Sequence, residues 1–253
     1  IWQAALGAVT YTNTSDTPTT TNRTLSLQVN DGTTSSAVVT KTISVTAVND
    51  VPVLADLHND AQSFIVGTST ALKLDTGAAA TVSDADHTAF ATNGYLLFAQ
   101  SSNGSIATGS LAFDGTTVKA GDDGVITAGE RVTVGGTDIG VVTTVNAATN
   151  VINDMLKITF DNASVATPAL VSTLLQNLYY SETQTNTANG ARSFDISVYD
   201  GVGTSTAATV TLTGTPAPAP AITTATCDWA SGQVVLTTQA RRLPCAPPDP
   251  APP

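Results

Sequence analysis

Cysteine, charged residues and aromatic residues are all scarce in this sequence. Only Cys227 and Cys245 occur among the 253 residues, both near the C-terminal end, so disulfides cannot staple the body of the chain. Charged residues amount to 11%, where about 25% is ordinary for a soluble domain. Aromatic residues amount to 5%, which leaves few for a ligand-binding surface once a core has been filled.

Long apolar runs and a basic leader are also missing. We therefore expect neither a signal peptide nor a membrane span in this stretch. The chain begins with Ile1 and not with Met, so we expect it to be a piece of a longer polypeptide. For such a piece, a missing leader says nothing about localisation.

Thr, Ser, Ala, Val, Gly and Asn fill the sequence instead. This mixture is rich in β-formers and turn-formers and poor in the Lys, Glu and Leu that cover helix surfaces, so an all-β protein is predicted. The formal net charge of −11 disfavours nucleic acid as a partner, because its phosphates require Lys and Arg. The acidity has two interpretations: Asp and Asn oxygens are hard ligands for Ca²⁺, or the charge only keeps the protein soluble.

The strongest pattern is an internal repeat. When Tyr11 is set on Tyr180, an offset of 180 − 11 = 169, Asp31 falls on Asp200 without a gap. In both copies an Asp-Gly turn lies between two strands that alternate apolar and polar residues. Residues 1–9 fall on residues 170–178, which lie within a short helix predicted from Pro168 to Leu178. The chain is therefore predicted to open inside a truncated copy, and two unrelated hairpins are the alternative.

These boundaries give four predicted parts. Residues 1–51 are the C-terminal part of a truncated repeat, whose return strand is predicted over residues 39–47. Residues 52–214 are a complete repeat of short strands, among them residues 109–113 and 131–134. Residues 215–221 are a Pro/Ala linker with polyproline stiffness. Residues 222–253 hold the truncated start of a third β-module, with two short strands in residues 222–236, and a disordered tail. The core of the complete repeat is predicted to contain Phe64, Leu72, Leu74, Leu96, Phe98, Leu111, Phe113, Ile158, Phe160, Leu174, Tyr180, Phe194, Ile196 and Val198.

The motifs around the first junction resemble those of a known family. Residues 29–54, VNDGTTSSAVVTKTISVTAVNDVPVL, resemble the closing strands of a cadherin-like repeat, which end in Asn-Asp-x-Pro. Residues 82–90, VSDADHTAF, resemble the Asp-x-Asp turn that follows early in the next repeat. Residues 11–32 are similar to segments in the tandem arrays of large bacterial surface adhesins and calcium-dependent exported proteins. The resemblance covers most of residues 1–236 and implies cadherin-like (Ig-like) β-sandwich repeats in tandem.

What the resemblance implies chemically is a Ca²⁺ site between repeats. It assigns Asn49 and Asp50 as linker ligands, Asp84 and Asp86 as ligands from the Asp-x-Asp turn, and Asp200 as a ligand from the Asp-Gly turn. Vertebrate-type repeats carry a further acidic motif, Leu-Asp-Arg-Glu, in the preceding module. That motif is missing here, which predicts a site short of ligands. The alternative for all five residues is that Asp-Gly and Asn-Asp are simply good turn formers.

Other constellations are weaker. Residues 119–130 match half of an EF-hand loop through Asp123 and Glu130, but the side chains at positions one and three cannot ligate, so a Gly-rich turn is favoured. The two histidines, His58 and His87, lie in no metal-spaced cluster, and no nucleophile elbow is present. We therefore predict no catalytic residue and no enzyme, and we expect His87 to lie on a loop beside the Asp-x-Asp turn.

These motifs predict a structural or adhesive segment of a large extracellular bacterial protein, secreted or at the cell surface, with Ca²⁺ stiffening the junction between repeats. Its partners would be neighbouring repeats of the same chain and a cell-surface or matrix ligand. The second junction lacks Asn-Asp and is predicted to be a proline-stiffened spacer without metal. The alternative is a ligand- or glycan-binding ancillary module of a secreted enzyme, whose signal would be exposed aromatic residues on one face.

Overall fold

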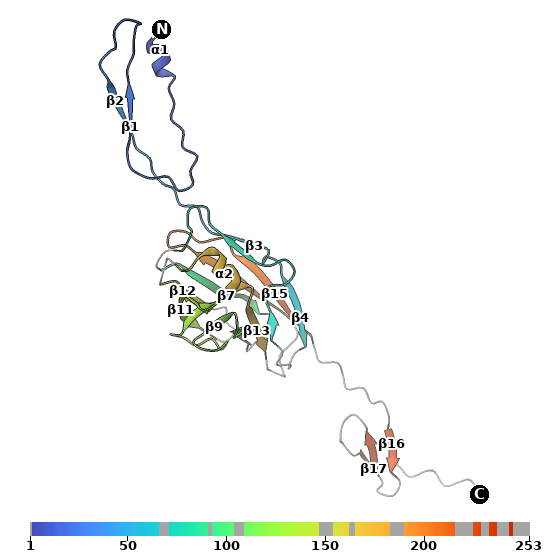
Figure 1. Ribbon diagram of the computed structural model, residues 1–253. Coiled ribbons are helices and arrows are strands. Elements are labelled where there is room, and N and C mark those ends of the chain that lie inside the picture. The colour runs from blue at the N-terminus through green and yellow to red at the C-terminus, as the bar shows by residue number, and fades with distance from the viewer. Residues whose placement is uncertain are drawn as a thin grey trace, which may run out of the picture. The chain divides into compact units, whose positions relative to one another are not determined.

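The computed structural model describes residues 2–65, 71–90, 93–103, 109–146, 154–161, 165–182 and 190–215, together with three short strands beyond them. Strands account for 46% of the structure and helices for 7%, so the predicted all-β class is confirmed. The chain divides into two compact units, Ile1–Thr215 and Pro216–Pro253, and each is described by itself (Figure 1).

The first unit begins with a short helix and a hairpin. Helix α1 (Trp2–Gly7) is followed by β1 (Arg23–Leu27), which pairs antiparallel with β2 (Val39–Ile43) as a two-stranded sheet. Leu25 and Leu27 are half buried, as the alternating pattern predicted, whereas Val39 on the partner strand is 64% exposed. The predicted return strand reached residue 47, but β2 ends at Ile43.

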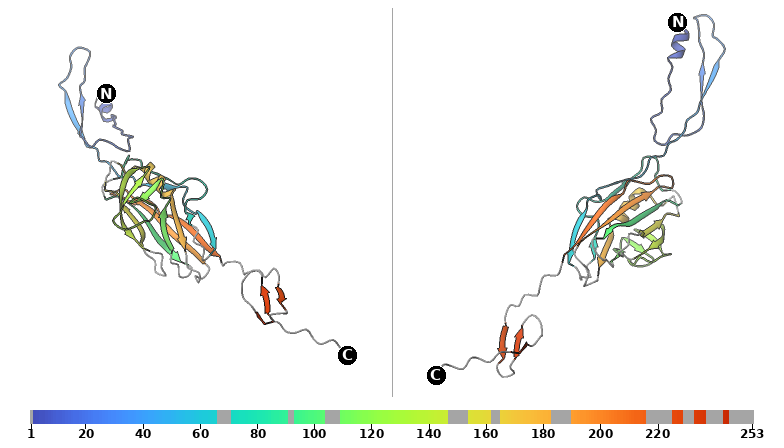
Figure 2. Two further views of the ribbon diagram at one scale, coloured as in Figure 1. Left: turned by 60° about the horizontal axis from the view of Figure 1, so that its bottom comes forward. Right: turned by 180° about the vertical axis from the view of Figure 1, so that it is seen from behind.

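Residues 53–215 contain an eight-stranded sheet with the order β4-β15-β14-β7-β12-β11-β10-β9. Every neighbouring pair is antiparallel except β15 and β4, which are parallel. The strands are β4 (Ala61–Ile65), β7 (Tyr95–Asn103), β9 (Val118–Ala120), β10 (Arg131–Val134), β11 (Thr137–Val145), β12 (Asp154–Thr159), β14 (Gly190–Tyr199) and β15 (Ala208–Thr215). Figure 2 shows this part of the chain from two further sides.

Two smaller sheets and one helix complete the first unit. The strands β5 (Leu72–Lys73), β13 (Leu178–Glu182) and β8 (Gly109–Phe113) form one sheet, and β3 (Val53–Ala55) pairs antiparallel with β6 (Thr81–Ser83). Helix α2 (Pro168–Leu175) begins with Pro168 in its first turn after the N-cap Thr167. The helix was predicted to extend to residue 178, but it ends at Leu175 because Leu178 already pairs with Phe113 as the first residue of β13.

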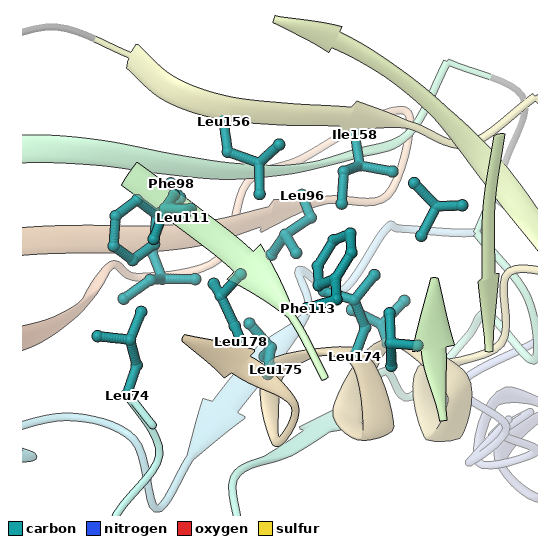
Figure 3. Packing of buried hydrophobic residues seen from close by; sticks show 14 of the residues in the cluster. Leu74, Leu96, Phe98, Leu111, Phe113, Leu156, Ile158, Leu174, Leu175 and Leu178 are labelled. Atoms are coloured by element: carbon teal, nitrogen blue, oxygen red, sulfur yellow. The ribbon is translucent and has the colours of Figure 1, made fainter. Parts of the chain in front are cut away.

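One hydrophobic core lies between these layers. In β14 and β7 the even-numbered side chains are buried and the odd-numbered ones are less so, which is the period of two that the sequence shows. Figure 3 shows Leu96 and Ile158 of the eight-stranded sheet facing Leu174 on helix α2. All six phenylalanines are buried. The predicted core residues are buried with one exception, Leu72, which is half buried against the cluster.

A buried ion pair interrupts this apolar core. Arg192 has no exposed surface, and its Nε and Nη2 atoms lie 2.8 and 3.0 Å from the two carboxylate oxygens of Glu182. The Tyr180 hydroxyl donates to Glu182 at 3.1 Å, and the guanidinium lies 5.0 Å from the centre of the Phe64 ring. Burial and the Glu182 charge raise the pKa of Tyr180, so its hydroxyl stays protonated and remains a donor.

The Asp-Gly turns of the two sequence copies have the same hydrogen bonds. Asp31 Oδ1 accepts from the amides two and three residues ahead of it, at 2.8 Å each, and Asp200 Oδ1 accepts from the same two positions at 2.6 and 2.7 Å. The glycine that follows each Asp has a positive φ, +99° and +107°. Five residues after each Asp, Ser36 Oγ and Ser205 Oγ accept from the amide of the preceding strand at 3.0 Å.

The second unit is described through three short strands. Strand β16 (Ala225–Asp228) pairs antiparallel with β17 (Gln233–Leu236), which pairs with β18 (Leu243–Pro244). The two strands predicted for residues 222–236 correspond to β16 and β17. Most of the predicted linker and of the predicted tail lies outside the described residues, but β18 is a described part of that tail.

Candidate metal centre

The first junction is positioned by the pairing of β3 with β6. Val53 pairs with Ser83, so the residues just before β3 lie beside the residues just after β6. Asp50 precedes β3 and Asp84 follows β6, which brings the linker to the Asp-x-Asp turn. The sequence contained both motifs, but only this antiparallel pairing brings them together.

Asp84 organises the turn after β6. Its Oδ1 accepts from the amides of Asp86 and His87, at 3.2 and 2.8 Å, as an Asx turn does. The side chain has no exposed surface, and its second oxygen, Oδ2, has no hydrogen-bond partner among the described residues. Burying an ionised carboxylate oxygen that accepts no hydrogen bond costs free energy. Binding of a proton or a cation at this oxygen would remove that cost.

Asp86 joins the turn to the linker. Its Oδ2 accepts from the Asp50 amide at 3.2 Å, and its side chain is 13% exposed. Asp50 therefore enters this network through its backbone, whereas the sequence predicted its side chain as a ligand.

Asp200 holds the other side of the linker. It is completely buried, and its Oδ2 accepts from Asn49 Nδ2 at 2.9 Å while Oδ1 holds the turn after β14. The amide nitrogen of Asn49 is thus directed at Asp200, which leaves only its oxygen for a metal. A Cβ on Gly203 would lie 2.6 Å from Val51 Cγ1 and 3.3 Å from Asn49 Nδ2, so a side chain there would displace the linker.

His87 belongs to the same cluster, although the sequence placed it only beside the turn. Its Nδ1 lies 3.2 Å from Asp84 Oδ1 and 3.0 Å from Asp86 Oδ1, and its side chain is 25% exposed. Burial lowers the pKa of His87, but the negative charges of Asp84, Asp86 and Asp200 outweigh burial and raise it. The field of the cluster is therefore strongly negative.

The two carboxylates also shift each other's pKa. Burial, with a hydrogen bond to Asp86, raises the pKa of Asp84 above its ordinary value. Burial also acts to raise the pKa of Asp86, but the interactions with Asp84, the Asp50 amide and His87 lower it overall. Two ionised carboxylates this close repel each other, and a proton on Asp84, a positive charge on His87 or a metal ion would each relieve that repulsion.

One further acidic residue, Asp16, lies near the junction. Asp16 lines a cavity of about 540 Å³ together with Asp50 and Asp84. It lies in the Thr-rich loop before β1. Asp16 was not singled out from the sequence, where its only signal is its acidic side chain.

The donor set fits a divalent cation. Asp84 and Asp86 place carboxylate oxygens close together on one turn, and the linker and Asp200 lie beside that turn. Carboxylate oxygens are the ligands that Ca²⁺ prefers, and it takes about six to eight oxygens. Within the described residues, Asp84, Asp86 and His87 are the one group of three whose ligand atoms lie within 4.8 Å of one another.

The half EF-hand loop is occupied by turn hydrogen bonds instead. Asp123 Oδ1 accepts from the Val125 amide at 2.7 Å, and Glu130 Oε2 accepts from the Thr127 amide at 3.2 Å. The other histidine, His58, accepts from the Thr209 amide through Nδ1 at 3.1 Å. The contacts of Asp123 and Glu130 favour a turn over a metal site in residues 119–130. That the chain has no catalytic residue stays a prediction.

Comparison of the chain with protein-family models, with curated proteins and with solved structures found no match. Among the helices that are described, none has the length and apolarity to cross a membrane. The chemistry of the junction therefore rests on its own residues.

Proposed function

We propose that this chain is a structural segment of a tandem-repeat extracellular protein, in which a divalent cation, Ca²⁺, fixes the junction between two cadherin-like β-sandwich repeats. The observation that carries the proposal is the buried Asp84 oxygen without a partner, at a point where the Asn49-Asp50 linker contacts two acidic turns. A cation there would bind the linker and the module at once. The hinge would lose freedom, which suits a stalk or an adhesin.

The equivalence of the two Asp-Gly turns supports the tandem arrangement. Their hydrogen bonds coincide at the sequence offset of 169, which unrelated hairpins would not require. By the same argument, Asp31 would be a cation ligand at another junction, upstream of the first copy. The low charge and the near absence of cysteine suit an exported bacterial protein, and the proposed location is extracellular.

The test is a calcium titration followed by thermal unfolding. Free Ca²⁺ at about one hundred times its Kd would stabilise the folded state by roughly 2.7 kcal/mol, which is a rise in Tm of about 5 to 10 °C for a domain of this size. Asp84→Asn should abolish the rise. Asp114→Asn is the matched control, because Asp114 also holds a turn by accepting from backbone amides but lies in another loop.

If Ca²⁺ and chelator leave the Tm of the wild type unchanged, the cation site does not exist. If the Asp84 variant keeps the full rise while the control also keeps it, a cation binds elsewhere and the junction is not its site.

The glycan-binding alternative finds little support in the aromatic residues. Tyr95 and Tyr199 lie 5.0 Å apart on the outer face of the eight-stranded sheet, but Lys157 Nζ stands 3.9 Å from the centre of the Tyr95 ring. A sugar would need to displace that ammonium to stack there. Among the described aromatic side chains, Tyr11 is the one that is largely exposed.

A further inference from the structure

We propose that the junction centre also takes a first-row transition-metal ion, represented here by Zn²⁺, with His87 Nδ1 as a nitrogen ligand, and that His87 sets the preference between this ion and Ca²⁺. The inference rests on the proposed cation site and adds the His87 nitrogen as a ligand and Zn²⁺ as a second kind of metal. Because Ca²⁺ prefers oxygen ligands, a site for Ca²⁺ alone gives no reason for an imidazole nitrogen beside both carboxylates.

The positions of the donor atoms match a small coordination sphere. Two atoms that each lie about 2.0 to 2.2 Å from one ion are about 3.0 to 3.5 Å apart in tetrahedral or octahedral geometry. His87 Nδ1 is 3.0 Å from Asp86 Oδ1, which has no hydrogen-bond partner among the described residues, and 3.2 Å from Asp84 Oδ1, which also accepts from two backbone amides. The three side chains can therefore surround one ion with small movements of their own.

The hydrogen bonds around the carboxylates leave the inward oxygens available. Backbone amides hold Asp84 through Oδ1 and Asp86 through Oδ2. Asp84 Oδ2 and Asp86 Oδ1 are buried and have no hydrogen-bond partner among the described residues, and Asp86 Oδ1 lies 3.0 Å from His87 Nδ1. Supporting bonds of this kind orient metal ligands, and they rigidify the site before the ion arrives.

The chemistry of the imidazole decides which ion benefits. A neutral imidazole nitrogen is a good ligand for Zn²⁺ and other first-row metals, whereas Ca²⁺ prefers oxygen. Replacing one oxygen ligand by nitrogen thus favours Zn²⁺ over Ca²⁺ at the same carboxylates. His87→Asn supplies an oxygen in place of the nitrogen and should reverse that preference.

An access path leads to the cluster. A groove of about 630 Å³ is lined by residues 81–84 and 87–88 and by residues of helix α2 with its N-cap, so Asp84 and His87 are among its lining residues. The partly exposed His87 ring borders this groove, so an ion can reach the nitrogen without unfolding the turn.

The experiment uses the two histidines as probe and internal control. Imidazole nitrogen resonances are followed by NMR while Zn²⁺ is added to the full chain, in a background where Cys227→Ser and Cys245→Ser remove competing thiols. We expect the Nδ1 signal of His87 to move and that of His58 to stay. In separate titrations, His87→Asn should weaken Zn²⁺ binding by about tenfold or more and change Ca²⁺ binding by less than about threefold.

Three results separate the possibilities. If Ca²⁺ raises the Tm of the wild type but Zn²⁺ leaves the His87 signal unmoved, the nitrogen ligand is refuted and the calcium junction stands. If His87→Asn weakens both ions equally, His87 supports the fold of the turn and does not select the metal. If neither ion binds the wild type, the junction site itself is wrong. Because the NMR arm uses the native residue, it decides the question even if the variant folds poorly.

Discussion

Removing the buried Arg192 guanidinium should cost far more stability than removing an exposed one. Arg192→Met leaves the Glu182 carboxylate buried without its counter-ion, and breaking a buried pair in this way costs about 3 to 5 kcal/mol. For a domain of this size, each kcal/mol lowers Tm by about 2 to 4 °C, so a fall of roughly 6 to 20 °C is expected. Differential scanning calorimetry measures it.

The matched control is Arg131→Met in the same unit. Arg131 Nη2 lies 2.6 Å from Asp138, and a second carboxylate, Asp161, contacts the same guanidinium. Hydrogen bonds to Asp161 and Asp138 raise the pKa of Arg131, but the three side chains are 42 to 46% exposed, so solvent screens the pairs. The loss should be at most about 1 kcal/mol.

A double variant identifies the cause. Arg192→Met with Glu182→Gln removes the buried charge and keeps an oxygen for the Tyr180 hydroxyl, so it should recover about 1 to 2 kcal/mol of the loss. Equal losses for the Arg192 and Arg131 variants would refute the argument from burial. A double variant no more stable than Arg192→Met would show that lost packing on Phe64, and not an unpaired charge, causes the loss.

Two further predictions concern the linker and a turn. Gly203→Ala should displace Val51 and speed proteolysis of the linker between β2 and β3. The control Val202→Ala should leave the cleavage rate unchanged, because the Val202 side chain is 66% exposed. Equal cleavage rates for the two variants would contradict the close contact between Gly203 and Val51. Partial burial raises the pKa of Asp114, but hydrogen bonds from the Val118 amide and other donors outweigh it and hold this pKa well below its usual range. A lowered folded pKa stabilises the protein above the unfolded value of about 3.9, so Asp114→Ala should cost about 1 kcal/mol at neutral pH, and its difference from the wild type should shrink as the pH falls below about 4. A difference that stays constant down to pH 2 would rule out the ionised carboxylate as its source.

Several features of the fold followed from the sequence because they are local. Alternation of apolar and polar residues predicted strands such as β8 and β10, whose bounds agree with the structure, and Pro168 predicted the start of helix α2. The core residues came from the same period of two. Elements of two or three residues, such as β3 and β9, carry too few side chains to show a period, so they were missed.

The buried pair was beyond sequence reasoning for a different reason. Arg192 and Glu182 lie on β14 and β13, which belong to different sheets, and nothing in their spacing predicts that two charges meet inside a core. Arg23, which the sequence offset of 169 sets on Arg192, instead begins β1 and donates to the Thr19 hydroxyl at 2.9 Å in an exposed hydrogen bond. The same residue in the same pattern therefore has different surroundings in the two copies.

For the candidate metal centre, the sequence by itself determined the residue types and the local turns. The Asp-x-Asp and Asp-Gly motifs form Asx turns because a carboxylate two or three residues before an amide can accept from it, whatever the rest of the chain does. The tertiary structure alone decided that β3 pairs with β6, that the side chain of Asp84 is buried and that His87 Nδ1 lies beside two carboxylates. It also decided that Asp16, from the loop before β1, lines a cavity with Asp50 and Asp84. These are contacts between segments far apart in the chain, and their energies depend on burial, which a sequence pattern does not specify.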